Sequence, residues 1–309
     1  MIDTATQPPA MKGTGRISSA LPSASPNWWV RAMRRFTRNR VSMTAAGILV
    51  GICLLSVFAP VVTPHSPAKQ YRKEGLKGGM PVGPSAQFLL GTDSNGRDMF
   101  TRLLYGGRAA FLVGVVASAL AVSAGVAIGS FAGISGGWVD MLLMRVVDVA
   151  LSLPTLFIIL MFVAISKPGL GITILVIALI GWAQPSRVFR SEVASLRERE
   201  FILASRSLGV SPMQIFTRHV FPHLIPLIVI YISLGIPAAL FAEASLSFLG
   251  LGVPPPQPAW GAMVQEGIAF YRASPAQIMM PGAAIVLTVV CFNLVGSGLR
   301  DALDPTVQR

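Results

Sequence analysis

The chain has 309 residues, of which 53% are hydrophobic and only 12% are charged. Soluble domains average about 25% charged residues, so this composition excludes a soluble globular protein and favours a polytopic membrane protein. The net charge of +12 lies mostly just outside apolar runs, which favours Lys and Arg in cytoplasmic loops over nucleic-acid binding.

The N-terminal part reads as a tail followed by an interfacial helix. Residues 1–26 are rich in Pro, Ser, Thr, Gly and Ala, and we expect a disordered tail. In the following stretch, NWWVRAMRRFTRNR, the residues Trp29, Met33 and Phe36 recur at helical spacing, and Arg31, Arg34, Arg35 and Arg38 lie between and beside them. This pattern predicts a helix that lies in the interface against anionic membrane lipid. It also places residues 1–40 in the cytoplasm.

Apolar runs of membrane length predict an all-α protein with about six transmembrane helices. The expected spans are residues 42–62, 109–134, 141–165, 170–184, 223–247 and 277–299. An even number of spans places both termini in the cytoplasm, and most Lys and Arg residues fall in the inside segments. The resulting organisation is a cytoplasmic part (1–40), a first helix (41–62), an external loop (63–107), a membrane domain (108–300) with a cytoplasmic loop (185–222), and a cytoplasmic C-terminus (301–309).

The end of the external loop can form an amphipathic helix. Thr92 or Asp93 can cap it, and Asp98 and Arg102 are four residues apart and can pair on it. Two interpretations of this helix stay open. It can form a platform beneath a docked external protein, or a lid that packs on the outer ends of the spans.

The second span carries glycines at a strict four-residue interval. On a helix such residues form a smooth stripe that allows another backbone to approach closely, within the protein or in a partner subunit. The residues of this predicted packing stripe are Gly125, Gly129, Gly133 and Gly137.

Ionisable residues within the predicted spans are few. Arg145 and Asp148 are three residues apart and can pair on one helix face. Glu243 lies toward the outer end of the fifth span, followed by Ser245 and Ser247. A buried carboxylate is a functional candidate, so these three residues are candidates for a gate or pathway, with structural pairing as the alternative.

The sequence contains no nucleotide-binding loop, no nucleophile elbow and no cluster of metal ligands. His219 and His223 are four residues apart, but a pair of histidines without a nearby carboxylate or thiol is a poor metal site. We therefore assign no catalytic residue and no metal ligand.

The segment FILASRSLGVSPMQIFTRHVFP, residues 201–222, carries a helix stop and a helix start. Gly209 can close the first helix, and Ser211 and Pro212 can cap and begin a second one. We expect the second helix to expose apolar residues such as Met213, Ile215 and Phe216 toward a groove on another protein. An interfacial helix resting on lipid is the alternative.

This segment resembles the signature loop of ABC-transporter permease subunits, E-A-A-x-x-x-G followed by I-x-L-P. The matching positions are Leu203-Ala204-Ser205, Gly209 and His219-Val220-Phe221-Pro222. The sequence departs from the pattern at Leu203, where the family has an acidic residue, and at His219 and Phe221. The residues that the resemblance assigns to ATPase coupling are Ala204, Ser205, Leu208, Gly209, Ser211, Pro212, Met213, Ile215, Phe216 and Pro222.

Four further stretches narrow the resemblance to the second permease subunit of dipeptide and oligopeptide importers, a subfamily that glutathione and nickel importers share. They are LGTDSNGRDMFTRLLYGGR, GWVDMLLMRVVD, AEASLSFLGLGVPPPQPAWGAM and FNLVGSGLRDALDP. From the external stretches we single out Asp93, Gly96, Arg97, Asp98 and Trp260. Prolines make the loop before Trp260 stiff, and we expect Trp260 in the interfacial belt.

The resemblance implies a type I ABC importer permease fold in a bacterial inner membrane. It implies pairing with a homologous permease and docking of two cytoplasmic ATPase subunits, each of which receives one coupling helix, in this chain at about residues 209–217. It also implies delivery of substrate by an external solute-binding protein. This chain would bind no cofactor itself, and the partner ATPases would use ATP and Mg. A stand-alone secondary transporter would instead show mid-depth charges or inverted repeats, and a membrane enzyme would show converging polar residues; the sequence shows neither.

Overall fold

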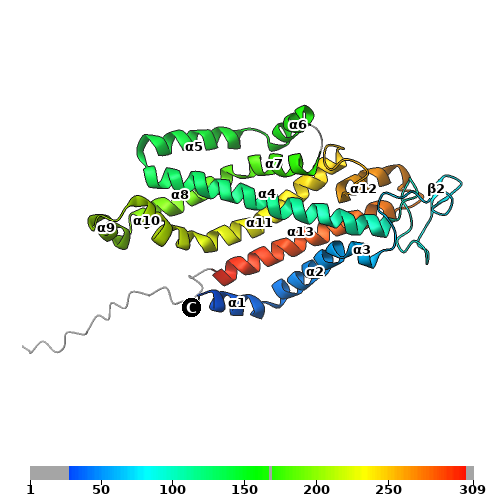
Figure 1. Cartoon of the computed structure of the whole chain (residues 1–309), viewed down its shortest axis with the longest axis horizontal. Helices are drawn as coiled ribbons and strands as arrows, with labels where there is room; N and C mark the ends of the chain where they lie inside the picture. The colour runs from blue at the N-terminus through cyan, green and yellow to red at the C-terminus, as the bar shows by residue number, and fades with distance from the viewer. Residues whose placement is uncertain (1–27, 167–168, 304–309) are drawn as a thin grey trace, which may run out of the picture.

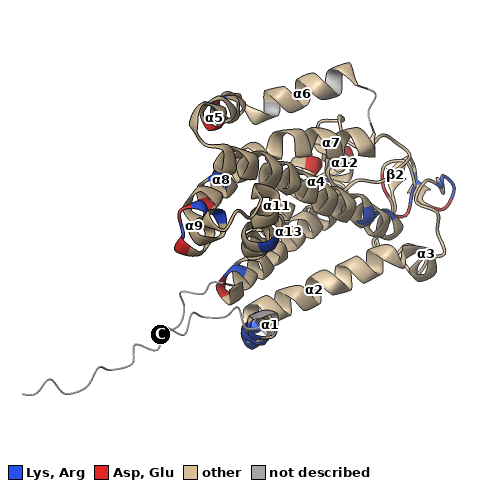
Figure 2. Ribbon diagram, turned by 60° about the vertical axis from the view of Figure 1, so that its left-hand side comes forward, with Lys and Arg blue, Asp and Glu red and all other residues tan. Residues whose placement is uncertain are grey.

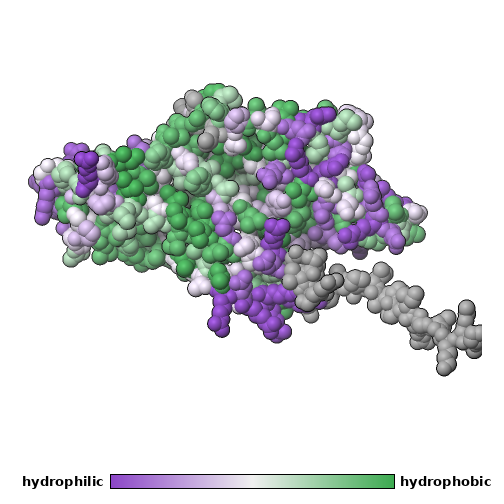
Figure 3. Space-filling model, turned by 180° about the vertical axis from the view of Figure 1, so that it is seen from behind, coloured by the Kyte–Doolittle hydropathy of each residue, from purple (hydrophilic) through white to green (hydrophobic). Residues whose placement is uncertain are grey.

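The computed structural model describes residues 28–166 and 169–303; the expected tail, residues 1–26, lies outside them. The elongated molecule is a bundle in which the long helices α2, α4, α11 and α13 run lengthwise (Figure 1). Hydrophobic residues gather over the middle and hydrophilic residues toward both ends (Figure 3). The helices are α1 (Trp28–Arg38), α2 (Arg40–Val57), α3 (Ala59–Val62), α4 (Met99–Ser135), α5 (Gly137–Ser152), α6 (Thr155–Ile165), α7 (Leu170–Gly181), α8 (Ala183–Arg197), α9 (Glu200–Ser207), α10 (Pro212–Ile215), α11 (Phe221–Phe248), α12 (Trp260–Gly267) and α13 (Ala276–Leu303).

Four helical segments among the described residues are long and apolar enough to cross a membrane: Arg40–Val57, Met99–Ser135, Pro212–Phe248 and Ala276–Leu303. A fifth arises if α7 and α8, which meet at a bend of 44°, count as one span. The predicted span 170–184 is therefore only the first part of a bent helix pair.

The predicted span 141–165 is not one helix. Leu153 adopts an extended conformation, and Pro154 follows it at the start of α6. A residue before proline is pushed out of the helical region, which explains why the helix breaks here into α5 and α6. In Figure 2 the two helices stand at the side of the bundle; α5 contacts α4 and α8, and α6 contacts α7.

The helix α4 starts earlier than predicted. The carboxylate of Asp98, not Thr92 or Asp93, caps it, since it accepts a hydrogen bond of 3.0 Å from the backbone N–H of Thr101. The separate amphipathic helix expected on the outside is thus the first part of α4. Before it, the segment 63–98 contains a small antiparallel hairpin of β1 (Leu76–Lys77) and β2 (Met80–Pro81).

Candidate functional site

The turn between α9 and α10 lies at one end of the bundle (Figure 1). Gly209 has a φ of +77°, a conformation that strongly favours glycine. The backbone N–H of Gly209 donates to the Arg206 carbonyl oxygen (2.9 Å), and that of Val210 donates to the Ser205 carbonyl oxygen (3.2 Å). These two bonds are the Schellman pattern of a glycine-terminated helix. Gly209 therefore ends α9.

The helix α10 begins two residues later with local capping. The Ser211 hydroxyl accepts a hydrogen bond of 3.3 Å from the Gln214 backbone N–H, and Pro212 is the first helical residue. After Ile215 the chain continues as a π-helical turn, Phe216–Val220, directly into α11. The second helix is thus the first part of a long continuous helical segment that includes α11.

Two apolar side chains project from this turn. Leu208 is 83% exposed and Met213 is 70% exposed. The other residues that were predicted to take part in ATPase coupling differ in their exposure to solvent. Exposed are Ala204, Ser211, Pro212 and Pro222, whereas Ser205 and Phe216 are half-buried. The expectation that Ile215 is exposed is wrong, because it is only 5% exposed and packs in the core.

The base of the turn is fixed by that core. Ile202 of α9, Ile215 of α10 and Val220 pack in one cluster with Phe189 and Val193 of α8. Since each of these side chains is nearly or fully buried, the turn is bound to two helices that enter the bundle. A force on Leu208 or Met213 would therefore reach α8 and α11.

The helix α8 is also tied to α5 by ion pairs. The Arg190 guanidinium donates to both oxygens of Asp140, through Nε at 2.9 Å and 3.2 Å, and this bond lowers the pKa of the Asp140 carboxyl. Asp148 pairs with Arg187 of α8. The predicted pair of Asp148 with Arg145 is therefore not formed, because a long-range partner holds the carboxylate.

Three of the four predicted packing glycines lie against α8. A methyl group added at Gly125 would meet Pro185, one at Gly129 would meet backbone atoms of Ser186 and Arg190, and one at Gly133 would meet Arg190 and Val193. Gly137 does not belong to this stripe. It follows the end of α4, has a φ of +57° and faces open space.

A buried ion network lies at the opposite end of the bundle, where α4 begins (Figure 1). Arg97 donates to Asp93 (2.6 Å) and to Glu266 of α12 (2.7 Å), and Arg102 pairs with the same two carboxylates. Arg102 therefore does not pair with Asp98, as its spacing had predicted, since Asp98 is used as the helix cap. The network joins the start of α4 to α12, and sequence spacing gave no sign of Glu266.

Gly96 and Trp260 lie at the same end of the bundle as the ion network. Gly96 turns the chain with a φ of +73° against the Tyr71 backbone. Trp260 is 3% exposed and donates its indole N–H to the Leu103 carbonyl oxygen at 2.8 Å. The expected place of Trp260 in the interfacial belt is thus wrong: its ring fills the space left by glycines of α4, Gly106 and Gly107.

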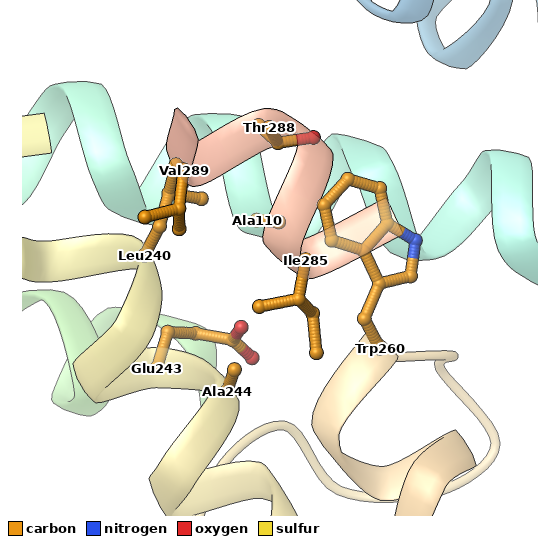
Figure 4. A pocket seen from close by; sticks show the side chains of 8 residues that line it. All are labelled: Ala110, Leu240, Glu243, Ala244, Trp260, Ile285, Thr288 and Val289. Carbon is orange, nitrogen blue, oxygen red and sulfur yellow. The ribbon is translucent and has the colours of Figure 1, made fainter. Parts of the chain in front are cut away.

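Glu243 lies in a narrow pocket between α4, α11, α12 and α13 (Figure 4). Its side chain is buried and accepts a hydrogen bond of 2.7 Å from the Ser247 hydroxyl. Ser245 points elsewhere, since its hydroxyl is exposed and donates to the Phe241 carbonyl oxygen. Glu243 and Ser247 thus form a structural pair within α11 that Ser245 does not join.

A much larger cavity, of about 690 Å³, lies between α4, α6, α7, α8 and α11, with Arg300 of α13 at its margin. Its wall is built mainly from small and apolar residues such as Ala117, Gly181 and Gly235. The volume falls in the range of small-molecule sites, about 300–1,000 Å³. Sequence reasoning did not find this cavity, because its lining comes from six separate helices.

Membrane-length helices around a small-molecule cavity, with a rigid two-helix turn at one end, define the transmembrane subunit of a transporter. Residues 125–309 match the family model of the binding-protein-dependent transport system inner membrane component, and residues 27–77 match the N-terminal TM domain of oligopeptide transport permease C. The chain belongs to this family of inner-membrane transport permeases.

Curated relatives extend over nearly the whole chain. The dipeptide transport system permease protein DppC of Alkalihalophilus pseudofirmus is 36% identical over 280 residues, which cover 91% of this chain and 90% of the relative. The oligopeptide permease OppC of Bacillus subtilis is 35% identical over 281 residues, 91% of this chain and 90% of that protein. The glutathione permease GsiD of Shigella boydii is 36% identical over 296 residues, 94% of this chain and 96% of that protein.

A solved structure shares the fold. A chain of the MetNI methionine ABC transporter, in an inward-facing conformation, superposes with a TM-score of 0.55 at 17% identity, over 66% of this chain and 96% of that chain. The fold of the membrane domain is therefore that of an ABC importer permease.

Proposed function

We propose that this chain is one of two homologous permeases of an ABC importer for dipeptides or oligopeptides. The peptide cargo is supported by the relatives DppC and OppC. Glutathione is the second candidate, because GsiD is equally similar. Both cargoes are small peptides with free carboxylates, and both are compatible in size with the cavity.

The observation that carries the proposal is the exposed pair Leu208 and Met213 on a buried base. Exposed apolar side chains on a rigid turn fit a groove on a partner protein. We assign this turn to docking of a cytoplasmic ATPase subunit, which would place both termini in the cytoplasm. ATP and Mg would bind to the ATPases and not to this chain, and a solute-binding protein would dock at the end that carries the hairpin.

The coupling step follows from the connections of the turn. A displacement of the docked ATPases would move α9 and α10 as one body, and with them α8 and the continuous helix of α10 and α11. Both α8 and α11 line the large cavity. Rigid-body motion at one end would thus change access to the cavity, which is a common form of conformational switching.

The test is co-purification of the ATPase subunits with the tagged permease from cells that express the whole transporter. The double variant Leu208→Asp with Met213→Asp should retain the fold, because both side chains are exposed, and should lose the ATPases. Leu89→Asp is the matched control, since Leu89 is an exposed leucine in the external segment. Equal recovery of ATPases with the double variant and with the control would overturn the docking assignment.

A second variant tests the turn itself. Gly209→Val places a β-branched residue at a φ of +77°, which costs about 1–3 kcal/mol locally. Gly78→Val is its control, because Gly78 also has a positive φ and open space around it but lies in the external hairpin. We expect loss of ATP-driven uptake with the first variant and retention with the second.

A further inference from the structure

The large cavity contains hydrogen-bonding side chains that have no partner within the described residues. The amide of Gln184, the hydroxyl of Tyr231 and the guanidinium of Arg300 all line it, and none of these groups forms a hydrogen bond or ion pair with another described residue. By contrast Ser118, which lines the same cavity, donates to the Ile232 carbonyl oxygen. The three free groups are therefore available to a ligand.

These groups come from helices that pass close to one another. The ring of Tyr231 on α11 lies 5.7 Å from that of Phe189 on α8, between ring centroids. On α13, a methyl group at Gly296 would lie 2.8 Å from Leu234 of α11, and Arg300 follows one turn later. Because α11 and α13 pack side by side, Arg300 lies at the part of the cavity that Tyr231 lines.

The charge that lines the cavity is positive. Among the described lining residues Arg300 is the single charged side chain, and no carboxylate is present. Arg300 is itself exposed, so its guanidinium lies at an open edge of the cavity. A guanidinium beside an apolar wall attracts an anion and forms strong, often bidentate hydrogen bonds with a carboxylate.

We infer that Arg300 holds the carboxylate of the transported molecule, with Gln184 and Tyr231 as additional donors. For a peptide this group is the free C-terminal carboxylate, while the small apolar residues of the wall accept varied side chains. This inference rests on the proposed peptide transport. It makes Arg300 a residue that selects for a free carboxylate, whereas the apolar wall contributes little selection among side chains.

The experiment measures ligand binding to the purified whole transporter in nanodiscs, without binding protein. The probes are trialanine and trialanine amide, which differ in the terminal carboxylate, and saturation-transfer NMR reports binding at millimolar concentration. We expect trialanine to bind at least tenfold more tightly than its amide, because a hydrogen bond to a charged group contributes about 1.5–3 kcal/mol. The preference should vanish in Arg300→Gln and persist in Arg300→Lys.

Two further variants separate the inference from a general charge effect. Arg38→Gln removes an exposed arginine that does not line the cavity and should retain the preference. Tyr231→Phe keeps the ring against Phe189 and removes only the hydroxyl, so the preference should fall by a smaller factor. Equal preference in wild type and Arg300→Gln, or equal loss in Arg38→Gln, would overturn the inference.

ATP-driven uptake of trialanine by the complete system, run in parallel, tests the proposed function separately. Uptake without a carboxylate preference in the binding experiment would overturn the role of Arg300 and leave peptide transport standing. An Arg300-dependent preference without uptake of any peptide would support the carboxylate site and overturn peptide transport.

Discussion

A single methyl group at Gly129 tests whether α4 and α8 are held at backbone contact. The Cβ atom of Gly129→Ala would clash with the Ser186 carbonyl oxygen and lie 2.9 Å from the Arg190 backbone nitrogen and 3.0 Å from the Phe189 Cβ. Two of these atoms belong to helix backbone and cannot rotate away. Adding a methyl to a packed site costs about 1–3 kcal/mol, and we expect the upper end because the helices must separate.

The assay is thermal unfolding of the purified protein in nanodiscs. A loss of about 3 kcal/mol would lower Tm by about 6–12 °C, since 1 kcal/mol corresponds to roughly 2–4 °C in a protein of 150–250 residues. Gly47→Ala is the control, because Gly47 lies in α2 with open space around it. There, alanine should be neutral or stabilise the helix by up to about 1 kcal/mol. A Tm for Gly129→Ala equal to that of Gly47→Ala would refute the reasoning.

Three other variants test the end of the bundle that holds the ion network, and the turn between α9 and α10. Arg102→Met leaves buried carboxylates short of a cation, so Tm should fall by the equivalent of about 3 kcal/mol or more; an equal fall in the exposed control Arg72→Met would contradict this. Trp260→Phe removes the indole N–H that donates to the Leu103 carbonyl oxygen and should cost about 0.5–1.5 kcal/mol, measured by denaturant unfolding; no change would show that the hydrogen bond is dispensable. Ser211→Ala removes a helix cap worth about 1 kcal/mol, so hydrogen exchange at the start of α10 should accelerate several-fold, and unchanged exchange would argue against the cap.

The sequence predicted well those features that depend on neighbouring residues. A glycine that must adopt a positive φ, followed by serine and proline, determines where α9 ends and α10 begins, because the bonds that form the turn span five residues or fewer. Apolar runs likewise predicted α2, α11 and α13, since a long apolar helix is stable in a membrane whatever it packs against.

Features that depend on contacts between distant segments were predicted less well. Ile215 was expected to be exposed because the sequence of α10 does not show that α8 lies behind it. The break in the span 141–165 was missed although Pro154 signals it, because overall hydropathy is insensitive to one residue.

The pairing of charges was decided by tertiary structure alone. Spacing along a helix predicted one ion pair between Asp98 and Arg102 and another between Arg145 and Asp148. In the structure Asp98 caps α4 instead. Arg102 pairs with Glu266 of α12, and Asp148 pairs with Arg187 of α8. The sequence by itself thus determined the membrane class, the main spans and the turn, because these follow from local conformation and hydrophobicity. Only the packed helices decided which charges meet and where the cavity forms, because those depend on distances between residues that are far apart in the chain.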